Sequence, residues 1–217
     1  SCPCTIWSPS TIPATVSDPD GSANELGVKF RSLSNGYITG IRFYKSLTNT
    51  GTHIGNLWTA TGTNLAQATF TGETATGWQQ VTFGTPVAIT AGTTYVASYH
   101  TSTGHYSADA NYFASAGVVT TYLEALRNGT DGPNGVFANS PTTTFPTSTF
   151  NSSNYYVDVI FVTTLPPDNT PPTVVSSLPL NGSTGIAINT AVSAVFNEAI
   201  DPATINGSTF ELRNASN

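Results

Sequence analysis

The sequence predicts an all-β protein, with an antiparallel, jelly-roll-like β-sandwich followed by part of an Ig-like β-sandwich. Short segments rich in β-branched and aromatic residues recur at intervals of roughly 8–12 residues, separated by clusters of Gly, Asn and Thr. Only 8% of the 217 residues are charged, against about 25% in an average soluble domain, whereas long exposed helices would need more Lys and Glu. A hydrophobic fraction of 38% is enough for a packed core.

The strand signals follow one another along the chain up to residue 164. In the first of them, Val28 and Phe30 alternate with Lys29 and Arg31, which is the two-residue period of a strand with one buried face. Turn sequences such as LSNG, TGETATG and TAGTT lie between the segments. We therefore expect strands at residues 25–32, 36–46, 55–61, 64–70, 78–83, 86–90, 94–100 and 155–164.

Two segments depart from this pattern. The run SAGVVTTYLEALRNG, which closes with Gly129, suits a short helix or an insertion. Residues 128–154 predict a long ordered loop, anchored by Phe137, Phe145 and Phe150. Loops of this length in compact domains are often functional.

A proline-rich stretch divides the chain. Four prolines within residues 165–172 predict a stiff, extended linker between a module at 1–164 and a second unit at 173–217. A complete Ig-like sandwich needs about 100 residues and seven strands, and about half of that follows the linker. We therefore expect the chain to be a piece of a longer protein, with the missing half either cut away or supplied by a neighbouring chain.

Charge and hydropathy narrow the classes of function that the sequence allows. The net charge is -6, and the basic cluster of Lys29, Arg31, Arg42 and Lys45 fits a solvated strand face, so nucleic acid is not an expected partner. No apolar run approaches the roughly 20 residues of a membrane span.

The two cysteines stand close together at the start of the chain. Cys2 and Cys4 provide no disulfide framework for a core, and a local or partner-chain disulfide, free thiols and a metal site all remain open. The small first residue, Ser1, is compatible with a processed, exported protein.

Several motifs carry a resemblance to known families. ELGVKFRS, GYITGIRFYKS, PVAITAGTTYVASYHTSTGHY and SNYYVDVIF occur in this order, and residues 2–164 resemble a bacterial secreted module, domain of unknown function 4082. The tail from DNTPPTVVSS to TFELRN resembles the first half of a bacterial Ig-like repeat. The resemblance implies an exported binding or structural module, at the cell surface or outside the cell, and no named reaction.

Carboxylates near the two ends of the module indicate a structural calcium ion. The segment SDPDGSANELG holds Asp18, Asp20 and Glu25, and Asp158 lies within the last expected strand. Many jelly-roll carbohydrate-binding modules hold calcium between their first and last strands, and by that analogy Glu25 and Asp158 would meet. The alternatives are a type I turn at DPDG, and an Asp158 that faces solvent or pairs with Arg42.

A second cluster combines aromatic and hydrogen-bonding side chains in the segment SYHTSTGHYSADANYF. Sugars have apolar faces and polar rims, so their sites pair an aromatic platform with His, Asn, Asp or Arg. A transition-metal site of the three histidines, with Asp109 as a further ligand, and structural hydrogen bonding are the alternatives. The predicted ligand-binding residues are His53, Tyr99, His100, His105, Tyr106, Asp109 and Tyr112.

Catalytic signals are weak, and the interpretation leans against an enzyme. There is no G-x-S-x-G motif, and no pair of carboxylates stands out as a glycosidase pair. The leading hypothesis is non-catalytic binding of a polysaccharide or glycan. The first alternative is a structural or adhesive building block of a surface filament or stalk, assembled by β-strand pairing with copies of itself or with neighbouring Ig-like domains. A metal-dependent enzyme is the third hypothesis.

Overall fold

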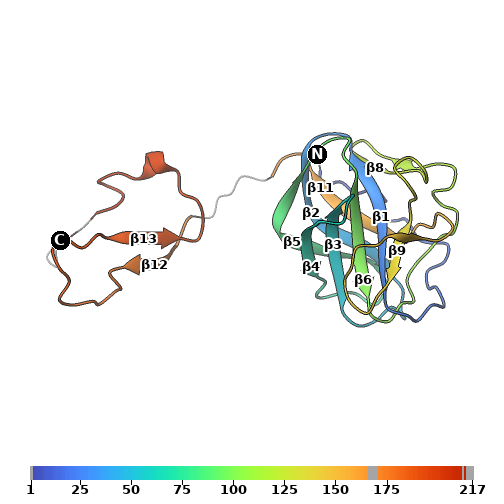
Figure 1. Cartoon of the computed structure of the whole chain (residues 1–217), viewed down its shortest axis with the longest axis horizontal. Helices are drawn as coiled ribbons and strands as arrows, with labels where there is room; N and C mark the ends of the chain where they lie inside the picture. The colour runs from blue at the N-terminus through green and yellow to red at the C-terminus, as the bar shows by residue number, and fades with distance from the viewer. Residues whose placement is uncertain (1, 166–170, 212, 214–217) are drawn as a thin grey trace. The chain divides into compact units, whose positions relative to one another are not determined.

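The computed structural model describes residues 2–165, 171–211 and 213, and the chain divides into two units, Ser1–Leu165 and Pro166–Asn217 (Figure 1). Five residues of the expected linker, 166–170, lie outside the described residues. Within the described part there is no α-helix, and every strand pairing is antiparallel. The prediction of an all-β, antiparallel fold is confirmed.

The larger sheet of the first unit has the strand order β10-β9-β1-β6-β3-β4, with β8 also paired to β1 and β7 paired to β8. Figure 1 labels β1, β3, β4, β6, β8 and β9 of this sheet. Its central strands alternate in polarity, so that one face packs inward and the other carries polar groups. The strands are β1 (Asn24–Ser32), β3 (His53–Thr59), β4 (Asn64–Thr69), β6 (Tyr95–Thr101), β7 (Val118–Val119), β8 (Leu123–Ala125), β9 (Val136–Asn139) and β10 (Ser148–Thr149).

The second sheet is three-stranded, in the order β11-β2-β5. Its strands are β2 (Gly36–Lys45), β5 (Gly77–Ile89) and β11 (Val157–Val162). The two strands expected at 78–83 and 86–90 therefore form one long strand, which pairs with β2 on both sides of an irregularity between Ile38 and Gly40.

The core lies between the two sheets. Phe43 of β2 and Phe161 of β11 face Leu57 of β3 and Tyr99 of β6, and all four side chains are fully buried. Burial of large aromatic and aliphatic surface is the main force that holds two such sheets together.

The run expected to be helical forms β7 and β8 instead. Leu123 and Ala125 are fully buried while Glu124 between them is half-exposed, which is the period of a strand. Pairing of Phe30 with Ala125 places this short strand beside β1, where its two apolar residues join the core. Tertiary burial has overridden the helix propensity of the sequence LEAL.

The expected long loop also contains strands. Phe137 lies in β9, which pairs with β1, and Phe145 packs edge-on against Trp58 with ring centroids 5.7 Å apart. These two phenylalanines anchor the segment. Phe150 does not, because it is 62% exposed.

The N-terminal segment is fixed to the last strand of the module. Cys2 and Cys4 form a local disulfide, and Cys4 pairs with Phe161 of β11 through two backbone hydrogen bonds of 2.8 and 2.9 Å. Of the alternatives left open by the sequence, the local disulfide is the one observed.

The second unit contains a two-stranded sheet of β12 (Val174–Leu178) and β13 (Ser193–Phe196), and a short 3-10 helix, η1 (Pro202–Thr204). Large apolar side chains of this unit are exposed, among them Val175, Ile188 and Val195. Across the described residues of both units, no helix has the length and apolar character needed to cross a membrane.

Candidate ligand-binding site

A cavity of about 350 Å³ lies at one end of the first unit. Asn24, where β1 begins, pairs with Thr101, where β6 ends, so the chain before β1 and the chain after β6 leave the sheet at the same end. These two segments meet the segment before β11 and the end of β9 around the cavity. Its walls include Asp18, Asp20, Tyr106, Phe137, Asn139, Phe150 and Tyr155.

Backbone hydrogen bonds hold the wall segments together. The N–H of Asp18 donates to the carbonyl oxygen of Tyr106 at 2.8 Å, and the N–H of Ala108 donates to that of Thr15 at 3.0 Å. Asp109 and Asn154 form a β-bridge with two bonds of 3.0 Å. The cavity is therefore built on paired backbone and not on loose loops.

Aromatic side chains form one wall. The ring of Tyr106 meets that of Tyr155 edge-on with centroids 5.7 Å apart, and the ring of Phe137 meets that of Tyr155 edge-on at 6.3 Å. Phe150 is exposed at the rim. Burial raises the pKa of Tyr106 and raises the pKa of Tyr155 to about 12, so both remain neutral phenols that can exchange hydrogen bonds with a ligand.

Two carboxylates also line the cavity, and one of them contacts the aromatic wall through the Tyr106 hydroxyl. Asp20 accepts hydrogen bonds from the Ser22 N–H at 2.8 Å, from Asn24 Nδ2 at 3.0 Å and from the Tyr106 hydroxyl at 3.4 Å. Partial burial by itself would raise the pKa of Asp20, but these hydrogen bonds outweigh it and lower that pKa. Asp18 accepts one bond, from the Asp20 N–H at 2.9 Å. Both carboxylates are half-buried at the cavity surface.

Among the residues predicted to bind a ligand, Tyr106 lines the cavity, and two others support its walls. His105 lies behind them, with a positive φ of 54°, its N–H bonded to the Asp20 carbonyl at 2.7 Å and its Nδ1 3.1 Å from the Asp18 carbonyl. The carboxylate of Asp109 accepts from the N–H groups of Ala14 and Thr15 and from a tyrosine hydroxyl, so it fixes the segment that precedes β1.

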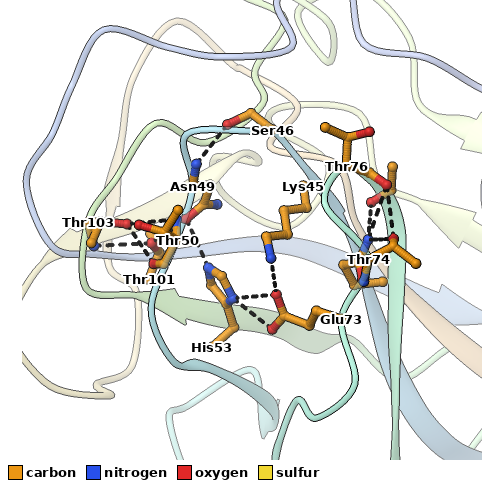
Figure 2. A network of polar contacts seen from close by, with 12 residues as sticks. Lys45, Ser46, Asn49, Thr50, His53, Glu73, Thr74, Thr76, Thr101 and Thr103 are labelled. Atoms are coloured by element: carbon orange, nitrogen blue, oxygen red, sulfur yellow. Dashed lines mark hydrogen bonds and ion pairs between the residues drawn. The ribbon is translucent and has the colours of Figure 1, made fainter.

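Three of the predicted residues are buried away from the cavity. Tyr99 belongs to the core. His53 is fully buried, with Nδ1 2.8 Å from a carboxylate oxygen of Glu73 and Nε2 2.9 Å from Asn49 Oδ1 (Figure 2). Burial lowers the pKa of His53, so the ring is neutral at neutral pH. His100, 4% exposed, contacts the carbonyl oxygen of Ser140 at 3.1 Å.

The expected grouping of the histidines is therefore corrected. Tyr99 points inward and His100, the next residue in the strand, points outward, because successive side chains of a strand face opposite sides. His53, His100 and His105 each have different partners. Tyr112 lies elsewhere, where its hydroxyl accepts from Trp7 Nε1 at 3.1 Å.

The residues predicted to hold calcium are divided between three places. Glu25 is buried on the larger sheet, where Ser98 and Asn56 donate to it and burial raises its pKa to about 8. Asp158 is buried on the other sheet, and Asp18 and Asp20 stay at the cavity.

Asp158 is held by the backbone. It accepts from the N–H groups of Ile6, Trp7 and Val159 and lies 4.0 Å from Arg42, while burial raises its pKa to about 6. Glu25 and Asp158 therefore do not meet. Across the described residues, no three His, Cys, Asp or Glu side chains form a group that could hold a metal ion.

Sequence reasoning missed the part of the site contributed by the long segment before β11. Phe150, Tyr155 and Asn139 were not singled out as ligand-binding residues, although all three line the cavity. The available signal was the unusual length of that segment and its aromatic content.

Comparisons with known proteins identify both parts of the chain. A family model described as Domain of unknown function (DUF4082) matches residues 10–157, and a model described as Bacterial Ig-like domain matches residues 168–217. These matches confirm the two resemblances seen in the motifs. A search of curated proteins found no match.

Proposed function

Because the chain belongs to the DUF4082 family, followed by a bacterial Ig-like domain, we propose that its first unit is a non-catalytic glycan-binding module of an exported bacterial protein. The all-β fold and the Ig-like domain fit a non-catalytic surface or structural protein. The family description names no ligand, so the proposal depends on the residues of the cavity.

The observation that carries the proposal is the pairing of an aromatic wall with a polar wall. Tyr106, Phe137 and Phe150 offer apolar rings on which the C–H face of a sugar can pack. Asp20 and Asn139 offer acceptors and donors for the hydroxyl groups at its rim. A cavity of about 350 Å³ is within the range of small-ligand sites and fits one or two sugar rings.

The test is binding of the full chain to a panel of insoluble polysaccharides and soluble oligosaccharides. Tyr106→Ala removes part of the aromatic wall and should weaken binding at least tenfold. Tyr122→Ala is the matched control, since Tyr122 is also half-buried but lines a different pocket. Binding to nothing on the panel, or an equal loss in both variants, would contradict the proposal. A parallel series in EDTA tests the calcium expected from the sequence.

A second candidate function is a building block that assembles through β-strand pairing. The observation in its favour is the two-stranded sheet of the second unit, on which Val174, Val175 and Val195 are exposed. Exposed strands with apolar side chains are templates for pairing with another chain. Light scattering over a range of protein concentrations should then detect association that Val195→Asp abolishes, and a strictly monomeric chain would contradict it.

A further inference from the structure

The cavity of the proposed glycan site carries negative charge without a cation to balance it. Asp18 and Asp20 are the charged side chains among the residues that line it. Within the described part of the chain, neither forms an ion pair. The one hydrogen bond to the Asp18 carboxylate involves Oδ1, so Oδ2 is left for a ligand.

Four of the five lysine and arginine residues of the first unit have partners away from the cavity, and the fifth, Arg127, is exposed and does not line it. Arg31 pairs with Asp131 at 3.4 Å, and Lys45 pairs with Glu73 at 2.6 Å. Arg42 lies 4.0 Å from a carboxylate oxygen of Asp158 and 4.4 Å from the ring centre of Trp78. Lys29 donates to the carbonyl oxygen of Asp131 at 2.8 Å. No lysine or arginine is among the described residues that line the cavity.

The two walls together favour a particular class of sugar. An ammonium group placed near the carboxylates gains charge-assisted hydrogen bonds, which are stronger than those of a neutral hydroxyl. The faces of Tyr106 and Phe150 attract a cation and also the C–H face of the ring that bears it. A sugar carboxylate or sulfate would instead be repelled by Asp18 and Asp20.

We propose that the cavity selects a glycan with free amino groups, such as a chain of deacetylated hexosamine, over its N-acetylated and neutral counterparts. This inference rests on the proposed function of the same site. It adds the chemical class of the ligand, since Asp18 and Asp20 decide which glycan binds while the aromatic wall decides that a glycan binds.

The test is calorimetry of the full chain with three oligosaccharides of equal length: chitosan with free amino groups, N-acetylated chitin and a neutral cello-oligosaccharide. We expect chitosan to bind at least tenfold more tightly than the other two. Asp18→Asn and Asp20→Asn should each remove most of that preference. Asp131→Asn is the control, because it removes the same charge from a residue that does not line the cavity.

Three outcomes overturn the inference, and they differ in what they leave standing. Equal affinities for all three sugars, lost in Tyr106→Ala, would leave glycan binding intact and remove the amino-sugar preference. Chitosan binding that Asp131→Asn weakens as much as Asp18→Asn does would be general attraction to an acidic protein. Binding of none of the three would overturn the inference, and failure across the wider polysaccharide panel would also overturn the proposed function.

Discussion

The rings of Phe43 and Tyr99 stack with centroids 4.1 Å apart and planes inclined by 18°. Phe43 belongs to β2 and Tyr99 to β6, so this contact joins the two sheets of the first unit. The buried hydroxyl of Tyr99 accepts a hydrogen bond from Asn49 Nδ2 at 3.3 Å. Desolvation raises the pKa of Tyr99, which is consistent with a neutral phenol that serves the core.

Truncation of Tyr99 should therefore affect stability and not ligand binding. Tyr99→Ala leaves a large cavity between the sheets and should lower the free energy of unfolding by about 3–5 kcal/mol. Tyr99→Phe keeps the ring and should cost about 1 kcal/mol, for one lost hydrogen bond. Denaturant unfolding followed by tryptophan fluorescence reports on the first unit, because Trp7, Trp58 and Trp78 all lie there. A cost of Tyr99→Ala below that of Tyr99→Phe would be inconsistent with this role.

Replacement of the Asp158 carboxylate should loosen the N-terminal segment. Asp158→Asn presents an amide where the Trp7 N–H now meets an oxygen, which leaves that buried donor without an acceptor, and it removes the negative charge 4.0 Å from Arg42. We expect a loss of about 2–3 kcal/mol in the free energy of unfolding. Asp131→Asn, at an exposed ion pair with Arg31, should cost less than about 1 kcal/mol. Similar losses in the two variants would refute the prediction.

The free energy of unfolding should fall between pH 6.5 and 8, because of Glu25. Burial raises its pKa from 4.5 to about 8, so in this range the folded chain keeps a proton that the unfolded chain has lost. The stabilisation that comes from protonated Glu25 is fully present below pH 4.5 and is lost as the pH rises through about 8. The free energy of unfolding should fall by up to about 1.4 kcal/mol per pH unit in this range.

Asp158 and His53 act below this window. Asp158, with its pKa raised to about 6, gives the same sign of slope below that pH. His53, whose pKa lies below its ordinary 6.5, gives the opposite sign there, because the unfolded chain binds the proton first. Unfolding measured at several pH values should show the slope above pH 6.5 in the native chain and a flat profile in Glu25→Gln. The same slope in both chains would assign it to another group.

Gly104 should be required for the shape of the cavity. Its φ is +62°, and a Cβ atom there would lie 2.2 Å from the carbonyl oxygen of Asp20 and 2.7 Å from that of Ser22. Gly104→Ala should therefore displace the wall that carries Asp20 and weaken glycan binding. We expect it to lower the free energy of unfolding by about 2 kcal/mol or more, as at other strained and crowded sites.

Gly92 provides the matched control for this substitution. It has a similar φ of +72° but nothing within 4 Å of the added Cβ. Gly92→Ala should cost only about 1 kcal/mol, for the unfavourable backbone conformation, and should leave ligand binding unchanged. Equal effects of the two substitutions in thermal unfolding and calorimetry would show that crowding against Asp20 is unimportant.

Local pattern determined most of the strands. The alternation of Val28 and Phe30 with charged residues fixed both the existence of β1 and the fact that one face is buried, because a strand has a side-chain period of two. The same argument placed β2, β3, β4, β6 and β11 within a few residues. It failed at Leu123 and Ala125, where helix-forming residues form a strand because burial beside β1 outweighs their propensity.

The tertiary structure alone decided which aromatic and charged residues can meet a ligand. The sequence placed both Tyr99 and Tyr106 among the ligand-binding residues, but one faces the core and the other the cavity, since alternation defines two faces without saying what covers each. The site joins Asp18, Tyr106 and Phe150, which are far apart in the chain. They meet because antiparallel pairing brings the start of β1 and the end of β6 to the same end of the sheet. This is a long-range arrangement that no local pattern encodes.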